Sequence, residues 1–311
     1  MFRTVTSARL QLAPAKRLIA PHRFYSATRP SFKSTADASS APPDPNALIV
    51  TEYLESPSDK GIAVLTLNRP QAKNAISREF LSQFSSSLNR IRFGGADKDV
   101  RAVILRSSVD GVFCAGADLK ERIHMSPAEV TEFLSSLRRT FSDLESLPVP
   151  TIAVLDGAAL GGGLEMALCC DLRVAGKGAK LGLPETKLAI IPGAGGTQRL
   201  PRLIGVPRAK ELIYTGEVLK PAKALALGLV NRISEEGSAL PLAFDLARSI
   251  VPQGPVAVRM AKTAIDRGMQ LEKDSGLEVE QLCYAQVIPT ADRMEGLRAF
   301  KEKRPPVYHG K

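Results

Sequence analysis

The sequence has few of the residues on which nucleophilic and metal-dependent catalysis most often rely. Its 311 residues include no tryptophan, three histidines and four cysteines. One of the histidines, His22, lies near the amino terminus, so only two remain that could serve as the base of a Ser–His–Asp or Cys–His catalytic site, and such a site is disfavoured. The cysteines show neither Cys-x-x-Cys spacing nor a histidine close by; they are Cys114, Cys169, Cys170 and Cys283. This pattern disfavours a zinc site and a disulfide framework, and we expect reduced, structural cysteines and no bound metal.

The common nucleotide-binding and hydrolase motifs are missing as well. The chain has no Gly-x-Ser-x-Gly and no Walker loop, and Gly193-Ala-Gly-Gly-Thr-Gln198 departs from Gly-x-Gly-x-x-Gly at its last position. Hydride transfer and nucleotide hydrolysis are therefore disfavoured, and we expect no cofactor.

Long apolar runs are absent, and the surplus of positive charge is concentrated at the amino terminus. No stretch is long and apolar enough for a secretory signal or a membrane span. The net charge is +10, but residues 1–36 hold seven basic and no acidic residues, which leaves 35 basic and 32 acidic residues in the rest. An Arg-rich, acid-free start is typical of a mitochondrial transit peptide. We predict a transit peptide and linker over residues 1–40, folding from about Leu48, and a location in the mitochondrial matrix without membrane contact.

The most informative stretch that is present is Ala159-Leu-Gly-Gly-Gly-Leu-Glu165. It follows the apolar run 151–155, which predicts a buried strand, and it precedes a helical pattern, so the glycines should form a strand-to-helix corner. Bare backbone N–H groups at a helix start favour an oxygen that gains negative charge. Glu185 follows a second short strand-like stretch, so two carboxylates could converge for acid–base work. The alternative is a Gly-rich turn whose glutamate only complements the helix dipole.

A second corner of small residues, Ala115-Gly116-Ala117, precedes a possible helix start at Asp118. An oxyanion hole built from main-chain N–H groups needs two segments that converge on one oxygen. We expect Ala115 and one of the glycines 161–163 to supply these donors. Asp118 is in addition a plausible helix N-cap, whatever the function of the protein.

The order of the apolar segments predicts an α/β fold with a largely parallel sheet. A hairpin is expected at 48–54 and 61–67, a helix at 77–91, and buried strands at 100–105 and 151–155. Ser126-Pro-Ala-Glu129 is a capping box that should open a helix to about Leu147. Four amphipathic stretches end the chain, at 239–251, 255–267, 276–287 and 291–303. They predict a helical layer that packs on an α/β core or on a neighbouring subunit.

Four of these segments together resemble the enoyl-CoA hydratase/isomerase (crotonase) family; they are Ala115-Gly-Ala-Asp118, Leu160-Gly-Gly-Gly-Leu-Glu165, Pro184-Glu185 and Ile191-Pro-Gly-Ala-Gly-Gly-Thr-Gln-Arg199. The resemblance extends from about Leu48 to the end. Three further segments are similar to the branch of the family that acts on 3-methylglutaconyl-CoA in leucine degradation; they are 183–192, 283–290 and 299–306.

This resemblance implies a crotonase-like spiral of ββα units with a carboxyl-terminal helical layer. The core would span residues 48–250, and residues 251–311 would form a helical trimerisation region in a homotrimer or homohexamer. The implied activity is that of a hydro-lyase, an enoyl-CoA hydratase that adds water across the 2,3 double bond of an α,β-unsaturated acyl-CoA. The substrate would be 3-methylglutaconyl-CoA and the product 3-hydroxy-3-methylglutaryl-CoA. Coenzyme A enters only as part of the substrate.

The resemblance also implies roles for single residues. The thioester carbonyl would lie between the N–H groups of Ala115 and Gly162, and Glu165 and Glu185 would hold one water near Gly193. The groove for CoA would be lined by Ala72, Lys73, Ala117, Asp118, Leu119 and Lys120, with Lys301 contributed by another subunit. Water addition pushes charge onto the thioester oxygen, where each preorganised donor typically lowers the barrier by about 2.7–4 kcal/mol.

Other reactions and functions stay open at this point. Isomerases of the same family commonly work with one acidic residue, and a thioester hydrolase would attack C1 instead of C3, so two glutamates favour the hydratase. Alternatives are a short-chain enoyl-CoA hydratase of fatty-acid β-oxidation and an RNA-binding relative. Animal relatives bind AU-rich RNA through a lysine-studded helix, whereas the corresponding segment here, 77–92, has three arginines and no lysine. Because phosphate contacts dominate non-specific affinity, we do not expect RNA binding.

The far end of 3-methylglutaconyl-CoA carries a second carboxylate, which needs a cation or several donors in the pocket. Arg122 is the candidate, because it follows Asp118 by four residues and so lies about one helical turn further along the same face. The alternative is that Arg122 is a solvated surface charge.

Overall fold

A computed structural model describes residues 47–94 and 99–311 of the chain. The described residues belong to one compact unit. The predicted transit peptide lies outside the described residues.

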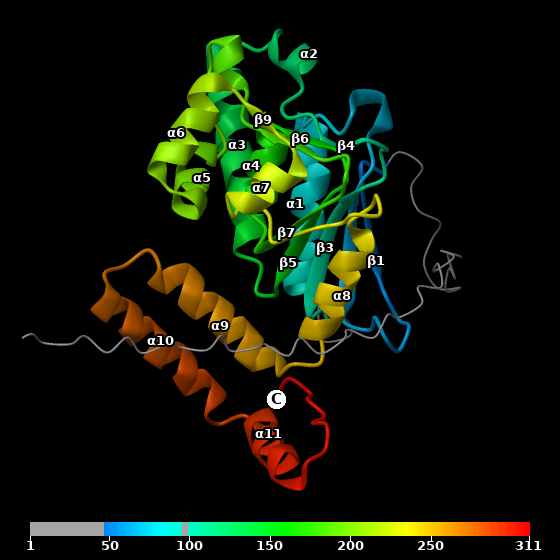
Figure 1. The fold of residues 1–311 in the computed structure, drawn as a ribbon, viewed down its shortest axis with the longest axis vertical. Coiled ribbons are helices and arrows are strands. Elements are labelled where there is room, and N and C mark those ends of the chain that lie inside the picture. The colour runs from blue at the N-terminus through cyan, green and yellow to red at the C-terminus, as the bar shows by residue number, and fades with distance from the viewer. Residues whose placement is uncertain (1–46, 95–98) are drawn as a thin grey trace, which may run out of the picture. The chain divides into compact units, whose positions relative to one another are not determined.

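Among the described residues, six strands form the larger of two sheets, in the order β1-β2-β3-β5-β7-β10 (Figure 1). The strands are β1 (Ile49–Tyr53), β2 (Ile62–Leu67), β3 (Ala102–Ser107), β5 (Thr151–Leu155), β7 (Leu172–Ala175) and β10 (Arg232–Ile233). Strands β1 and β2 form the predicted antiparallel hairpin, with Ile49 opposite Leu67, and every other pair is parallel. The prediction of a largely parallel α/β sheet is confirmed.

The central strands are apolar throughout because both faces of this sheet are covered. Alternate side chains of a strand point to opposite faces, so Val64 and Ile104 pack with Phe244 of α8 (Leu240–Ile250). Their neighbours Leu65 and Leu105 point to the other face, which α1 (Arg78–Phe93) and α3 (Pro127–Glu145) cover. The predicted capping box at the start of α3 is present, with the Ser126 hydroxyl and the Glu129 carboxylate each accepting an N–H from the other residue's backbone.

The second strand of each repeat leaves the large sheet and joins a smaller one. In the described part of the chain, this small sheet has the order β4-β6-β8-β9, with β4 (Val112–Cys114), β6 (Ala158–Leu160), β8 (Lys180–Gly182) and β9 (Val218–Leu219). The pairs β3–β4, β5–β6 and β7–β8 therefore repeat one pattern, each followed by helix. These helices are the short α2 (Leu119–Arg122) with α3, α4 (Gly162–Leu168), and η2 (Glu185–Leu188) with α5 (Gly196–Ile204) and α6 (Val206–Thr215). The expected spiral of ββα units is confirmed.

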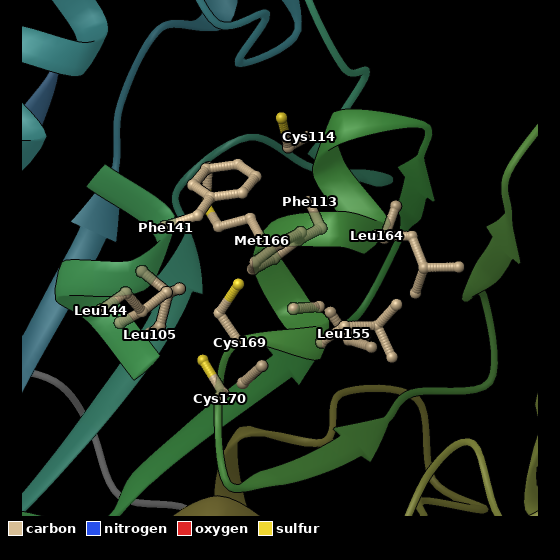
Figure 2. Close-up of a cluster of buried hydrophobic side chains, with 14 of the residues drawn as sticks. Leu105, Phe113, Cys114, Phe141, Leu144, Leu155, Leu164, Met166, Cys169 and Cys170 are labelled. Atoms are coloured by element: carbon tan, nitrogen blue, oxygen red, sulfur yellow. The ribbon is translucent and has the colours of Figure 1, made fainter. Parts of the chain in front are cut away.

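All four cysteines are buried and free, in agreement with the structural role predicted for them. Figure 2 shows Cys169 and Cys170 among Leu105, Phe141 and Met166 in the core between α3 and α4. Burial raises the pKa of the Cys170 thiol to about 12, so this side chain stays a neutral, apolar group at physiological pH.

Beyond the sheets, α7 (Pro221–Ala226) precedes α8, and the chain ends in α9 (Pro255–Gly268), α10 (Lys273–Val287) and α11 (Ala291–Glu302). In Figure 1 the last three helices, orange to red, continue from the end of α8 and do not lie on a face of either sheet. An ion pair of 2.6 Å between Lys262 and Asp171 ties α9 to the core. Large apolar side chains such as Met269, Leu282 and Phe300 are exposed on these helices. The assignment of residues 251–311 to a trimer interface stays a prediction.

Two further findings concern the described residues alone. None of their helices combines the length and the apolar character needed to cross a membrane. None of their His, Cys, Asp and Glu side chains form a group of three or more that could hold a metal ion.

Candidate active site

The predicted strand-to-helix corner is present where β6 meets α4. Strand β6 ends at Leu160, and α4 begins at Gly162. Between them Gly161 has φ +53 and ψ −125, a backbone conformation that favours glycine. A Cβ atom on Gly161 would also lie 3.1 Å from Oε1 of Glu185, so this corner packs directly against the second glutamate.

The structure corrects the expected oxyanion donor on the first segment. The N–H of Ala115 donates a hydrogen bond of 3.1 Å to the carbonyl of Lys73 and is therefore not free for a ligand. Ala117 has a different environment. The parallel bridge between Ile76 and Ala117 uses the carbonyl of Gly116 and the N–H of Asp118, which leaves the N–H of Ala117 directed away from Ile76.

The N–H groups of Ala117 and Gly162 lie close together. The nitrogen of Ala117 is 3.6 Å from the position of a Cβ atom on Gly162, and a Cβ atom on Gly116 would lie 3.4 Å from the nitrogen of Gly162. Within the described residues neither N–H has a hydrogen-bond acceptor. Two free donors from two segments are what an oxyanion hole requires, and here they are Ala117 and Gly162.

Asp118 acts as the helix N-cap that its sequence position indicates. One of its carboxylate oxygens accepts N–H bonds from Lys120 and Glu121, at 3.1 and 3.3 Å. The other accepts a bond of 2.8 Å from Arg69. Arg69 and the α2 backbone therefore occupy this carboxylate, and the Asn68–Asn74 loop is fastened to the segment that carries Ala117.

Glu165 is the more deeply buried of the two glutamates, with 2% of its surface exposed. Its Oε1 accepts two backbone N–H bonds, from Ala194 at 2.8 Å and from Gly196 at 2.7 Å. Burial raises the pKa of this carboxyl, while the N–H groups of Gly196 and Ala194 and the charges of Arg199 and Arg138 oppose the rise. These donors stabilise the ionised form of Glu165.

Glu185 begins the short helix η2 and has a poorer set of partners. Its Oε2 is buried and has no hydrogen-bond partner in the described part of the chain. Burial, helped by the negative charge of Glu165, raises the pKa of Glu185 from the ordinary 4.5 to about 7. A protonated Glu185 beside an ionised Glu165 is the expected state of the pair near neutral pH.

One cavity of about 2230 Å³ connects most of the predicted site residues. It is lined by Ala115, Ala117, Leu119, Arg122, Gly162, Glu165, Glu185 and Gly193. The remaining predicted residues do not line it; they are Ala72, Lys73, Asp118, Lys120 and Lys301. Ala72 ends the 3-10 helix η1 (Pro70–Ala72), Lys73 follows in a left-handed conformation, and Lys301 lies exposed on α11.

Sequence reasoning missed the side chains that support Glu165 from behind. Arg199 donates to the carbonyl of Ala194 at 3.0 Å, and Arg138 donates to the carbonyl of Gly193 at 2.7 Å. Glu145 holds Arg199 through two bonds, of 3.0 and 2.6 Å. Arg199 closes the Gly-rich segment 193–199, so its position in that segment was the available signal. Arg138 and Glu145 lie on α3 without any distinctive local pattern.

Comparisons with known proteins agree with this geometry. Residues 58–311 match the enoyl-CoA hydratase/isomerase family. Human mitochondrial methylglutaconyl-CoA hydratase is 54% identical over 256 residues, which cover 81% of this chain and 75% of the human protein. Mouse mitochondrial enoyl-CoA hydratase domain-containing protein 2 is 50% identical over 284 residues, 90% of this chain and 95% of that protein.

A solved structure gives the same result for the fold. The crystal structure of an enoyl-CoA hydratase from Bacillus anthracis superposes with a TM-score of 0.80 at 46% identity, and the match covers 85% of this chain and 100% of the bacterial one. The motifs, the spiral of ββα units and the match over residues 58–311 lead to one assignment. The chain belongs to the enoyl-CoA hydratase/isomerase family.

Proposed function

We propose that the protein is an enoyl-CoA hydratase that acts on 3-methylglutaconyl-CoA. The observation that supports this most directly is the unequal environment of the two glutamates in one cavity. Glu165 accepts two N–H bonds, whereas Oε2 of Glu185 accepts none from the described residues. Hydration needs one group that accepts a proton and one that delivers a proton, and this pair offers both.

In the proposed mechanism Glu165 is the general base. Its ionised carboxylate takes a proton from the water, whose oxygen bonds to C3 of the substrate. The electron pair of the double bond moves toward C1 as this bond forms, and charge develops on the thioester oxygen. Glu185, protonated near neutral pH, then delivers its proton to C2. The proton and hydroxyl added to the substrate together amount to one water. After this step Glu165 holds the proton taken from the water and Glu185 is ionised, so a proton passes from Glu165 back to Glu185, within the pair or through solvent, before the next turnover.

The N–H groups of Ala117 and Gly162 would receive the thioester oxygen. Gly162 is the first residue of α4, so the positive end of the helix dipole adds to the stabilisation of the developing charge. Each such donor typically contributes about 2.7–4 kcal/mol to lowering the barrier. The same two donors would also polarise the substrate carbonyl and so make C3 more electrophilic.

The substrate assignment rests on the relatives and on the cations of the cavity. Methylglutaconyl-CoA hydratases of human and mouse are among the similar proteins, and their names state their substrate. Arg122 lines the cavity, and its side chain makes no hydrogen bond or ion pair with the described residues, so it is available for the distal carboxylate. A short-chain enoyl-CoA is the second candidate, because the chain is about as similar to enoyl-CoA hydratase domain-containing protein 2.

We further propose a mitochondrial matrix location, an acyl-CoA as the ligand, and a homotrimer or homohexamer built through residues 251–311. The relatives named mitochondrial and the acid-free leader support the location. Ala72, Lys73, Lys120 and the partner subunit's Lys301 remain proposed contacts of CoA. RNA binding is not part of the proposal. Arg92, one of the three arginines of the segment 77–92, pairs with Asp143 of α3 and donates a hydrogen bond to Ser146 at the end of that helix, so it is not free to contact a phosphate.

Steady-state hydration kinetics test the proposal. The purified protein is expected to hydrate both 3-methylglutaconyl-CoA and crotonyl-CoA, with the larger kcat/KM for the former. Faster turnover of crotonyl-CoA would favour the short-chain hydratase, and no turnover of either would overturn the hydratase assignment. Fusing residues 1–40 to a fluorescent protein and following its uptake into mitochondria tests the leader, with a deletion of those residues as the control.

A further inference from the structure

A network behind Glu165 connects it to α3 through four hydrogen bonds. Oε1 of Glu165 accepts the N–H of Ala194, the carbonyl of Ala194 accepts Nη1 of Arg199, and Arg199 grips Glu145 with Nε and Nη2. The distances along this path are 2.8, 3.0, 3.0 and 2.6 Å. Ala194 is thus held between Glu165 and Arg199, and Arg199 is held between Ala194 and Glu145.

Arg199 is well placed to hold the 194–196 loop, because both its backbone and its side chain donate hydrogen bonds to that loop. It lies in the first turn of α5, its own N–H donates to the carbonyl of Gly195 at 2.8 Å, and its guanidinium returns to Ala194. Gly195 has φ +105, and a Cβ atom there would collide with Nη1 of Arg199. The absence of a side chain at Gly195 therefore leaves the space that the guanidinium of Arg199 occupies, between the two residues, Ala194 and Gly196, that donate their N–H groups to Glu165.

We infer that Arg199, held by Glu145, is a positioning residue that keeps the 194–196 loop in the conformation in which Glu165 remains an ionised proton acceptor. The inference rests on the proposed hydratase function for its role in catalysis. Arg199 does not touch the reacting atoms in this scheme. It acts by holding the backbone of Ala194 in place through the carbonyl of that residue. The peptide group whose N–H donates to Glu165 joins Gly193 to Ala194, and its carbonyl accepts a bond from Arg138, which strengthens that donor.

The charges around Glu165 come from each neighbouring element. Arg199 approaches from α5, Arg138 and Glu145 from α3, and Glu185 from η2. The thiol of Cys169, which directly follows α4, is neutral because burial raises its pKa. Burial raises the pKa of Glu165, while the N–H groups of Gly196 and Ala194 and the charges of the two arginines lower it. Removal of Arg199 takes away both a positive charge and the support for two N–H donors, so the pKa of Glu165 should rise.

The test is the pH profile of kcat/KM for Arg199→Gln. The acidic limb of the profile, which reports the base, should move to higher pH by about one unit, so that activity relative to wild type falls by up to about tenfold on that limb and returns toward the wild-type value above it. Arg199→Lys keeps the charge without the two-pronged grip and should move the limb less. Arg208→Gln, an exposed residue of α6 that does not line the cavity, is the matched control and should leave the limb in place. Equal loss at every pH, or no loss, would overturn the inference.

A second measurement does not depend on turnover. Melting temperatures are compared for the wild type, Arg199→Gln, Glu165→Gln and the double variant at pH 8. If Arg199 acts on ionised Glu165, its removal should lower Tm clearly in the wild type and much less in the Glu165→Gln background, where no carboxylate remains to support. Additive changes would overturn the inference. If the hydratase proposal alone is wrong, the wild-type protein will be inactive, but the effects of Arg199→Gln and Glu165→Gln on Tm will still be non-additive.

Discussion

Glu165 and Glu185 face the same cavity, and the negative charge of Glu165 contributes to raising the pKa of Glu185 to about 7. The protonation state of Glu185 therefore depends on the charge of Glu165. The pair is expected to act as a unit, with one proton shared between two unequal positions near neutral pH.

The first prediction concerns the removal of either proton-transfer group. Glu165→Gln and Glu185→Gln change little volume, so the fold should persist while kcat for hydration falls by about 10²–10⁴-fold. Steady-state kinetics, with circular dichroism to confirm folding, give the answer. A Glu185→Gln enzyme that hydrates at nearly the wild-type rate would contradict the two-carboxylate mechanism.

The second prediction is a change of stability with pH. The pKa of Glu185 is raised from 4.5 to about 7 in the folded chain, so folded protein holds this proton more tightly than unfolded protein does. The stabilisation is fully present below pH 4.5 and is lost as the pH rises to 7, where the buried carboxylate becomes a cost. Glu185→Gln stays neutral, and its free energy of unfolding relative to wild type should rise by about 1–2 kcal/mol across this window, after allowance for partial exposure.

Thermal melts at several pH values between 4.5 and 8 measure this difference. Glu211→Gln, an exposed position on α6 outside the cavity, is the control for the removal of a surface carboxylate. A Glu185→Gln difference that is constant over the same range would show that Glu185 is not the titrating group.

The third prediction tests the oxyanion donors through two glycines. Gly116 and Gly111 both have positive φ, at +95 and +66, so an alanine strains the backbone at either position. Only at Gly116 would the new Cβ crowd the site, at 3.0 Å from the carbonyl of Leu160 and 3.4 Å from the nitrogen of Gly162, whereas at Gly111 it meets open space. Gly116→Ala should lower kcat by about 10²–10³-fold, and Gly111→Ala should lower Tm alone. Equal kinetic effects at the two positions would argue against a hole between Ala117 and Gly162.

The fourth prediction concerns the choice of substrate. If Arg122 pairs with the distal carboxylate, Arg122→Met should raise KM for 3-methylglutaconyl-CoA much more than for crotonyl-CoA, because only the former has a carboxylate to leave unpaired. Arg208→Met, outside the cavity, serves as the control. Equal effects on both substrates, or none on either, would remove Arg122 from the site and leave the hydratase assignment untouched.

Local patterns predicted the elements well where the signal lies within a few residues. The capping box at Ser126 correctly opened α3, and the apolar runs correctly located β2, β3 and β5. The glycine corner before α4 was equally clear, since three glycines between a strand and a helix leave few other structures. These features depend on hydrogen bonds and side-chain periodicity that close within one or two turns of chain.

The errors arose where distant segments meet. Ala115 and Ala117 are indistinguishable as residue types, and the contact that decides between them is the bridge to Ile76, in another part of the sequence. That bridge turns the N–H of Ala117 toward the cavity, while Lys73 takes the N–H of Ala115. Arg199 and Glu145 likewise meet only because α5 packs beside α3 in the folded chain.

Because the proposed oxyanion donors belong to the main chain, ordinary amino-acid replacement cannot delete them, except by proline. The two glutamates, in contrast, can each be lost through a single codon change. Mutation will therefore abolish proton transfer at this site far more easily than it abolishes the main-chain hydrogen bonds to a thioester oxygen. A lineage that loses Glu165 or Glu185 keeps a pocket that stabilises the same enolate-like charge, and such a pocket is a ready starting point for the evolution of a different acyl-CoA reaction.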